Sequence, residues 1–433
     1  MPALGALVAE PLFLLTDTAL VGHLGNDELA GLGIASILLQ TVVGLLIFLA
    51  YATTPTVARR LGAGDRSGAI RAGIDGVWLA VGLGIGLVVV GLPLARPLVE
   101  SFGSTNGVTE AATTYLSISL WGLPGMLIVI ASTGLFRGLQ DTRTPLVVAV
   151  AGFALNAVLN VLFIYGLGWG IAGSAAGTVV AQWAMAVVFI FMAVRAARAT
   201  GATLRPGLRG VGGAAASGGW LLIRTASLRV AMLATIVVGT ALGVTELATL
   251  QIALTLFGLI ALILDALAIA GQAMIGHGLG AADLERVSAI KARLVTLGVW
   301  SGAVTGAVLA AVSWLLGPVF SSDPVVHSYL TLVVLLMAAG VPLAGYVFVL
   351  DGVLIGAGDA RYLALTGILN LAVYLPLLLL VSVTGAGIGW LWAAFGYGYI
   401  AARAVTLGVR ARGTRWLGTG TESGSETGTG TET

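Results

Sequence analysis

Residues 61–65 read Leu-Gly-Ala-Gly-Asp, and residues 279–283 read Leu-Gly-Ala-Ala-Asp. The second stretch follows the first by 280 − 62 = 218 positions, and three other patterns recur with the same separation. These patterns pair residues 24–30 with 242–248, 122–124 with 340–342, and 138–143 with 356–361. A repeat that matches almost without a gap predicts two equivalent halves in one chain.

The composition is that of a membrane protein. The 433 residues are 58% hydrophobic and 9% charged, with a mean hydropathy of +1.03, whereas soluble domains carry about a quarter charged residues. Apolar runs of about 20 residues, each able to cross ~30 Å of hydrocarbon as a helix, recur along the chain. They lack the alternating pattern of a membrane β-barrel. The fold class is therefore predicted to be an all-α polytopic membrane protein.

We expect twelve spans, six in each half. They are predicted near residues 2–22, 31–56, 72–94, 113–136, 145–166, 171–194, 220–241, 248–275, 291–316, 329–354, 362–383 and 387–408. Because six is an even number, both halves enter the membrane from the same side, which makes the repeats parallel. This predicts two pseudo-symmetric six-helix bundles with a binding site between them.

Basic residues gather in alternate loops. The loops after spans two, four and six contain Arg59, Arg60, Arg66, Arg71, Arg137, Arg143, Arg195, Arg198, Arg205 and Arg209, and the second half continues this pattern. The positive-inside rule then places both termini in the cytoplasm. We expect an N-terminal lobe at 1–195, a cytoplasmic linker at 196–219 and a C-terminal lobe at 220–412. The Gly/Thr/Ser/Glu-rich residues 413–433 are expected to form a disordered cytoplasmic tail.

Several classes of function find no support in the sequence. The chain has no cysteine, a net charge of only +2 and three histidines at span ends without metal-ligand spacing, so we expect no cofactor, no metal site and no nucleic-acid partner. A Walker motif is absent, which excludes direct drive by ATP. The first apolar run contains Glu10 and no basic leader, which favours a first span over a cleaved signal peptide.

One acidic residue stands out in the first span. Asp17 lies within the apolar run 12–21 and has no basic neighbour in it. An ionised Asp at a helix centre costs roughly 2.5 to 3.5 kcal/mol, so such a residue faces a cavity or a partner and carries a proton or an ion. The alternative is an interfacial Asp, since Asp17 lies only ~8 Å from the end of the span at 1.5 Å per residue.

The residues quoted above carry a family likeness. Residues 17–25, 61–65 and 136–143, together with their second-half echoes, resemble the multidrug and toxic compound extrusion family, in its DNA-damage-inducible-protein-F-like branch. The resemblance implies two six-helix bundles around a V-shaped central cleft, in a bacterial cytoplasmic membrane. It also implies export of small molecules driven by re-entry of protons or sodium.

The resemblance also implies a site in the N-terminal lobe. In prokaryotic members a first-helix Asp joins polar residues on the fifth and sixth helices, and the matching positions here are Asp17, Asn156, Asn160 and Thr178. Asn156 and Asn160 share one helix face because they are four residues apart. Archaeal relatives carry a second carboxylate where this chain has Asn160. Asp17 is then the only ionisable group of the site, which favours a proton over sodium.

Four other residues are secondary candidates. Gln182 shares a helix face with Thr178, and Glu10 lies one heptad before Asp17, either lining the cleft or buried and protonated. Asp265 and Asp351 are isolated acids of the second half, and they form either a second-lobe cation site or structural bridges to Arg229. These are the candidate site residues Asp17, Asn156, Asn160, Thr178, Glu10, Gln182, Asp265 and Asp351.

The sequence therefore predicts a monomeric secondary antiporter and not an enzyme. It would export amphipathic, cationic or neutral small molecules, with Asp17 taking up a proton from outside and rearranging its hydrogen bonds. One charge crossing 100 mV supplies ~2.3 kcal/mol, which suffices for this. Sodium coupling is one alternative. A lipid-linked oligosaccharide flippase would need a cationic cleft, whereas the spans offer Arg229 and little else. A lipid-modifying enzyme would need clustered acid/base or metal-binding residues, which the sequence lacks.

Overall fold

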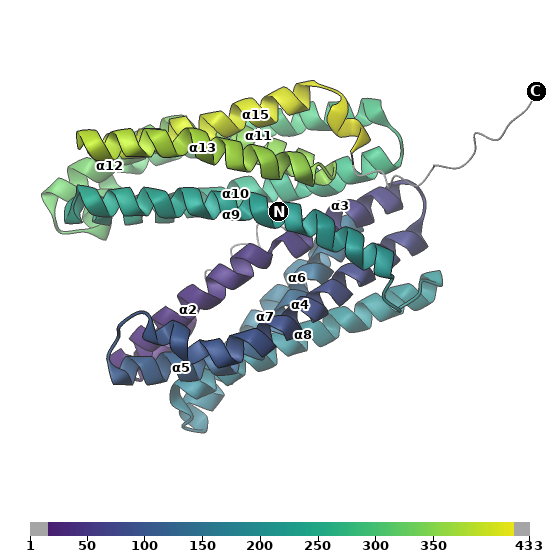
Figure 1. The fold of residues 1–433 in the computed structure, drawn as a ribbon, viewed down its shortest axis with the longest axis horizontal. Coiled ribbons are helices and arrows are strands. Elements are labelled where there is room, and N and C mark those ends of the chain that lie inside the picture. Colours follow the sequence, from purple (N-terminus) through teal and green to yellow (C-terminus); the bar gives the residue numbers. More distant parts are fainter. Residues whose placement is uncertain (1–15, 420–433) are drawn as a thin grey trace, which may run out of the picture.

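The structure, a computed structural model, describes residues 16–419, which form helices joined by short loops (Figure 1). Residues 16–22 are helical, and Glu10 lies outside the described residues. The first half continues with α2 (Asn26–Leu46), α3 (Phe48–Gly62), α4 (Arg66–Glu100), α5 (Asn106–Leu120), α6 (Leu123–Gly138), α7 (Arg143–Val161), the π-helical η1 (Leu162–Gly166) and α8 (Gly170–Thr200). The second half consists of α9 (Leu208–Leu242), α10 (Val244–Gly280), α11 (Leu284–Phe320), α12 (Pro324–Gly356), α13 (Ala360–Thr384), α14 (Ile388–Ala393), the π-helical η2 (Ala394–Tyr399), α15 (Ile400–Arg412) and the 3₁₀ turn η3 (Arg415–Gly418).

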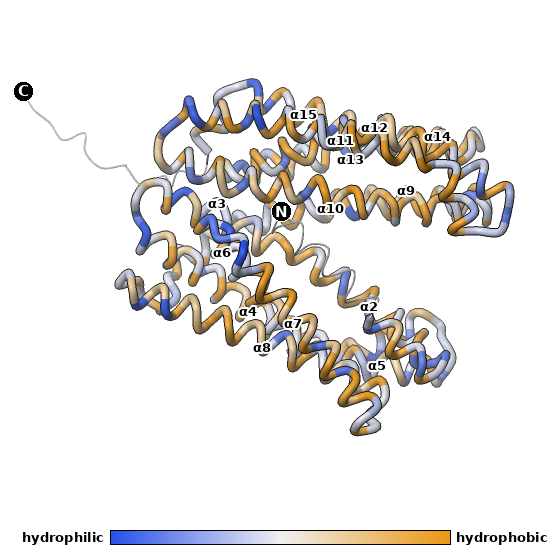
Figure 2. Tube along the Cα trace, turned by 180° about the vertical axis from the view of Figure 1, so that it is seen from behind, coloured by the Kyte–Doolittle hydropathy of each residue, from blue (hydrophilic) through white to orange (hydrophobic). Residues whose placement is uncertain are grey.

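The all-α membrane class is confirmed. Within residues 16–419, nine helices are long and apolar enough to cross a membrane, and the pair α5 and α6, bent by 51°, makes a tenth. The two other expected spans are residues 2–22, of which 16–22 are described, and residues 387–408, which fold as α14, η2 and α15. Apolar residues cover the long helices, and hydrophilic residues gather at their ends (Figure 2).

The repeated loop motif has a local physical reason. Its fourth position adopts a left-handed backbone in both halves, with φ of 80° at Gly64 and 54° at Ala282. Its fifth position then caps the following helix, because Asp65 accepts a hydrogen bond from the backbone amide three residues on at 2.7 Å and Asp283 does the same at 3.0 Å. Such a cap satisfies an amide that the first turn of a helix leaves unpaired. The motif therefore turns the chain and starts α4 and α11.

The two halves form two bundles arranged as a V. They converge at the end that carries loops 62–66 and 280–284 and diverge toward the end that carries loops 100–106 and 320–324 (Figure 1). At the convergent end α3 packs against α9 and α10. The expected duplicated two-bundle architecture is thus present.

The two bundles are in contact at Gly62 of α3 and Gly280 of α10. A Cβ added to Gly62 would lie 2.0 Å from the carbonyl oxygen of His277, and a Cβ added to Gly280 would lie 1.9 Å from that of Arg59. Arg59 and His277 are themselves 277 − 59 = 218 positions apart. Each half therefore contributes an equivalent glycine and an equivalent carbonyl group to the contact. Only residues without a side chain let the two backbones approach so closely.

The C-terminal segment packs against this contact between α3 and α10, which we call the seam. Arg59 donates hydrogen bonds to the carbonyl oxygens of Ala357 at 3.0 Å and Thr419 at 2.6 Å. Trp416 is only 1% exposed, and the Lys291 ammonium lies 5.5 Å from the centre of its ring. The expectation of a disordered tail from residue 413 is therefore wrong for residues 415–418, because the buried indole anchors them.

The segment expected to link the lobes is largely helical. α8 continues to Thr200 and α9 begins at Leu208, so only residues 201–207 of the predicted linker 196–219 lack regular structure. The positive residues of this segment do not prevent helix formation, because long basic side chains extend from a helix into water. The lobe boundaries themselves stay a prediction.

We predict that Gly280→Leu opens the seam between the bundles. The added side chain meets the backbone of α3, which cannot move aside as a flexible side chain would. Ala58 is fully buried, and an added Cβ on Gly276 would lie 3.1 Å from its Cβ, so Ala58→Cys reports on the seam. The chain has no other cysteine. Maleimide labelling of this cysteine should become about tenfold faster, which corresponds to ~1.4 kcal/mol.

Gly82→Leu is the matched control, because nothing lies within 4 Å of a Cβ added there. It should leave the labelling rate of Ala58→Cys unchanged. Equal labelling rates in the two leucine variants would contradict the proposed contact.

Candidate functional site

Asp17 lies inside the N-terminal bundle and is 4% exposed. Its Oδ1 accepts hydrogen bonds from the Ser174 hydroxyl at 2.6 Å and the Asn160 amide at 2.8 Å, and its Oδ2 accepts one from the Tyr115 hydroxyl at 3.1 Å. All three donors are neutral. Among residues 16–419, no basic side chain forms an ion pair with Asp17. The low exposure of Asp17 does not fit the water-solvated side chain that the interfacial alternative assumes.

A second set of contacts extends the network along α7 and α8. The amide of Asn160 also donates to Oδ1 of Asn156 at 3.1 Å, and the amide of Asn156 donates to Oγ1 of Thr178 at 2.9 Å. The predicted residues Asn156, Asn160 and Thr178 thus lie together, with Asn160 contacting Asp17 directly and the other two joined through it. Oδ1 of Asn160 is buried and has no hydrogen-bond partner among the described residues.

The sequence interpretation missed two direct partners of Asp17. Ser174 precedes Thr178 by one helical turn on α8, so the spacing argument that grouped Thr178 with Gln182 would have found it. Tyr115 lies on α5, and nothing in the sequence indicated that α5 contacts the first span. Gln182 is outside the network, and its Oε1 makes no hydrogen bond to any described residue.

The acids of the second half have other surroundings. Asp351 forms ion pairs with Arg224 and with Arg403, the latter at 3.1 Å. The predicted bridge to Arg229 is therefore wrong, because Arg229 is exposed and points toward α2, where its Nη2 would lie 2.5 Å from a Cβ on Gly44. Asp265 forms no ion pair with a described residue.

The count of arginines within the spans also needs correction. Arg137 lies in α6, Arg224 in α9 and Arg403 in α15, in addition to Arg229. The statement that the spans offer Arg229 and little else is wrong. Arg224 and Arg403 lie within the predicted spans 220–241 and 387–408 and were overlooked, and Arg137 directly follows the predicted span 113–136 but belongs to α6. The second half therefore carries more positive charge in its interior than the sequence interpretation allowed.

The architecture and this network define a class of protein. A duplicated all-helical bundle that surrounds a buried acid with neutral donors is typical of membrane transport proteins. The chain belongs to the MatE family of transporters, whose model matches residues 2–162 and 225–380.

Relatives and solved structures agree with this assignment. The chain is 31% identical over 386 residues to Protein DETOXIFICATION 44, chloroplastic, of Arabidopsis thaliana, covering 84% of this chain and 72% of that protein. It is 27% identical over 297 residues to DNA damage-inducible protein F of Escherichia coli, covering 65% and 63%. A crystal structure of MATE in the bent conformation matches with a TM-score of 0.87 at 21% identity, covering 95% and 93% of the two chains. The resemblance stated from the motifs is confirmed.

We predict that Ser174 and Asp17 are energetically coupled. Removing a neutral donor from a charged acceptor costs about 1.5–3 kcal/mol, more than a bond between neutral groups. Unfolding free energies of Ser174→Ala, Asp17→Asn and the double variant should therefore show a coupling energy of roughly 1 kcal/mol or more. Ser301→Ala, which removes a bond to a carbonyl of its own helix, should show none with Asp17→Asn. Additive effects of Ser174→Ala and Asp17→Asn would contradict direct contact with the carboxylate.

Proposed function

We propose that the protein exports amphipathic small organic molecules across a bacterial cytoplasmic membrane in exchange for protons, which bind at Asp17. The observation that supports this most is the set of partners around Asp17, which consists of neutral hydroxyl and amide donors. An acid without a fixed countercharge can exist in both charge states at moderate cost, which is the property that a coupling site needs.

The basic loops and the arrangement of the bundles support an orientation of the protein in the membrane. The basic loops after α3, α6 and α10 mark the cytoplasmic side by the positive-inside rule, and the bundles converge there (Figure 1). With this orientation, the two bundles diverge toward the outside (Figure 1). One structural relative with a TM-score of 0.85 is titled an outward-facing conformation of a multidrug resistance MATE family transporter.

Protonation changes what the carboxyl group can accept and donate. The charged form accepts from Ser174, Asn160 and Tyr115, whereas the protonated form must itself donate one hydrogen bond. The unpaired Oδ1 of Asn160 is an acceptor in the same network. A proton from outside would therefore require the network linking the first helix to α7 and α8 to rearrange. That rearrangement is the step that we link to substrate release.

Asp17→Asn should fold normally and abolish efflux of an ethidium-like dye driven by a pH gradient in inverted vesicles. The asparagine keeps the shape of the side chain but cannot exchange a proton. Asp27→Asn, which changes an exposed acid at the start of α2, should retain wild-type efflux. Unaltered efflux in Asp17→Asn would remove Asp17 from the coupling step.

Sodium coupling predicts a different ion dependence. At a fixed pH gradient, replacing sodium by potassium should leave the initial rate of dye efflux unchanged within about twofold, because no carboxylate among residues 16–419 joins Asp17 in its network to hold a metal cation. Reconstituted protein with defined internal and external ions provides the measurement. If efflux stops without sodium and a sodium gradient restores it, the proton assignment is incorrect and sodium drives the exchange.

A further inference from the structure

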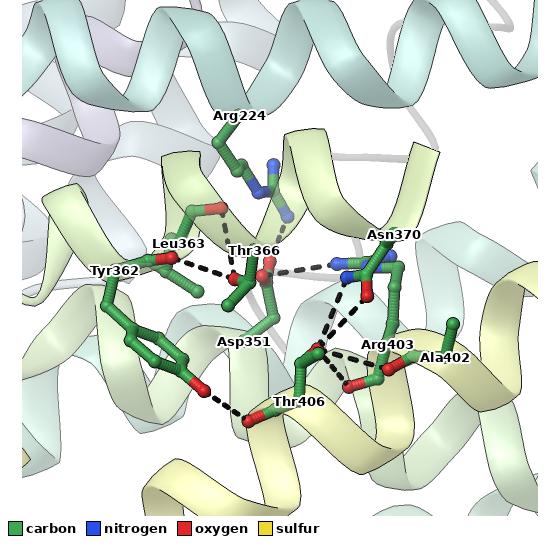
Figure 3. Close-up of polar contacts among 9 residues, drawn as sticks. All are labelled: Arg224, Asp351, Tyr362, Leu363, Thr366, Asn370, Ala402, Arg403 and Thr406. Carbon is green, nitrogen blue, oxygen red and sulfur yellow. Dashed lines mark hydrogen bonds and ion pairs between the residues drawn. The ribbon is translucent and has the colours of Figure 1, made fainter. Parts of the chain in front are cut away.

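A second charged cluster lies inside the C-terminal bundle. Asp351 of α12 contacts two guanidinium groups, one from Arg224 of α9 and one from Arg403 of α15 (Figure 3). The side chains are 9–13% exposed. Two positive groups face one negative group, so one positive charge has no partner within the triad. An uncompensated charge in a bundle interior is costly, typically by several kcal/mol.

The triad lines a narrow pocket between α9, α12, α13 and α15. Thr366 and Asn370 contribute a hydroxyl and an amide to its wall, and the remaining lining residues include Leu228, Leu363 and Leu407. Nε of Arg224 is buried and has no hydrogen-bond acceptor among the described residues. Asp351 therefore does not use every N–H donor of Arg224.

The surroundings do not neutralise the excess charge. Arg137 and Asp265 lie within electrostatic range of one another, and Asp265 also interacts with Arg224, Arg403 and Asp351. The group thus contains three arginines and two aspartates. Asp265 makes no ion pair with a described residue. Counted over the whole group, three positive charges face two negative charges, so a positive balance of 3 − 2 = 1 remains.

The cluster has no counterpart in the first half of the chain. The positions 218 residues before Arg224, Asp351 and Arg403 hold alanine, threonine and methionine. The duplicated architecture can be built without these charges, since the first half adopts it. Architecture alone therefore does not account for the arginines.

We propose that Arg224 and Arg403 bind one anionic group, a carboxylate or a phosphate, in the pocket beside Asp351. Guanidinium groups recognise both oxyanions through paired N–H donors. A single bound anion balances the charge of the triad. The anion has two sources, the headgroup of an acidic lipid or an anionic soluble molecule. This site is separate from Asp17 and does not depend on proton coupling there.

Binding to the full-length protein tests the site without a transport assay. In an uncharged detergent, the thermal unfolding midpoint is measured against increasing phenyl phosphate, and benzylamine serves as the cationic probe of similar size. Phenyl phosphate should stabilise the wild-type protein and benzylamine should not. In a second arm, nanodiscs of phosphatidylcholine are compared with nanodiscs that also contain phosphatidylglycerol.

The diagnostic variant is Arg403→Gln, which leaves Arg224 paired with Asp351 and so removes only the excess charge. It should raise the half-saturating concentration of phenyl phosphate at least tenfold, or abolish the stabilisation by phosphatidylglycerol. Arg403→Lys keeps the charge and should stay within threefold of wild type. Arg96→Gln changes an exposed arginine paired with Glu100 and should have no effect. Where Arg403→Gln does not fold, Arg224→Gln is the equivalent variant.

The pattern of responses identifies the source of the anion. An effect of Arg403→Gln confined to phenyl phosphate supports a soluble anion, and an effect confined to phosphatidylglycerol supports a lipid headgroup. An effect in both arms supports a site that accepts either source. If the Arg403→Gln protein responds to both probes as the wild type does, or if neither probe stabilises the wild type, the triad is only a bridge within the bundle and the proposal is overturned.

Discussion

The close approach of α3 and α10 constrains the rest of the structure. Gly62 and Gly280 bring two backbones within contact distance, which fixes how the two bundles meet at their convergent end. Helices in a bilayer gain little from hydrophobic burial against one another, so packing of small residues must hold such an interface. Because the two halves make equivalent contributions to the contact, the two bundles diverge from it in equivalent ways. The V shape and the exposure of the facing sides at the other end follow from this crossing.

The two halves share a backbone fold and differ in the side chains of their interiors. The positions 218 residues after Asp17 and Asn156 are Thr235 and Tyr374, whose hydroxyls lie 2.6 Å apart. Tyr374 packs within an aromatic group that includes Phe395 and Tyr399. At these positions, the polar network of the first half is thus replaced by a Thr–Tyr hydrogen bond within an aromatic cluster. Each half carries its own charged group at a position where the other half has none.

The helices and the loop motif were predicted from short-range signals, and the repeat from its constant separation of 218 positions. The grouping of Asp17 with Asn156, Asn160 and Thr178 was implied by the family resemblance. Asn156 and Asn160 share a face by spacing, and the loop motif specifies its own turn and cap. Contacts between distant helices have no such signal. Tyr115 reaches Asp17 from α5, and Arg224 and Arg403 reach Asp351 from helices 127 and 52 positions away in the sequence. The burial of Trp416 likewise depends on the seam, which a composition argument about the tail does not include.

The partners of the two buried acids assign them different roles. Asp351 is held by two guanidinium groups, and removing its charge would leave both without their partner, at a cost of several kcal/mol. Within the described part of the chain, the partners of Asp17 are hydroxyl and amide groups, which can also bond to the neutral form of a carboxyl group. Asp17 is therefore better suited than Asp351 to gain and lose a charge in each cycle. Asp351 is better suited than Asp17 to stay charged, because it holds two arginines in place. The two buried acids on which the two proposals rest thus lie in different bundles and have different kinds of partners.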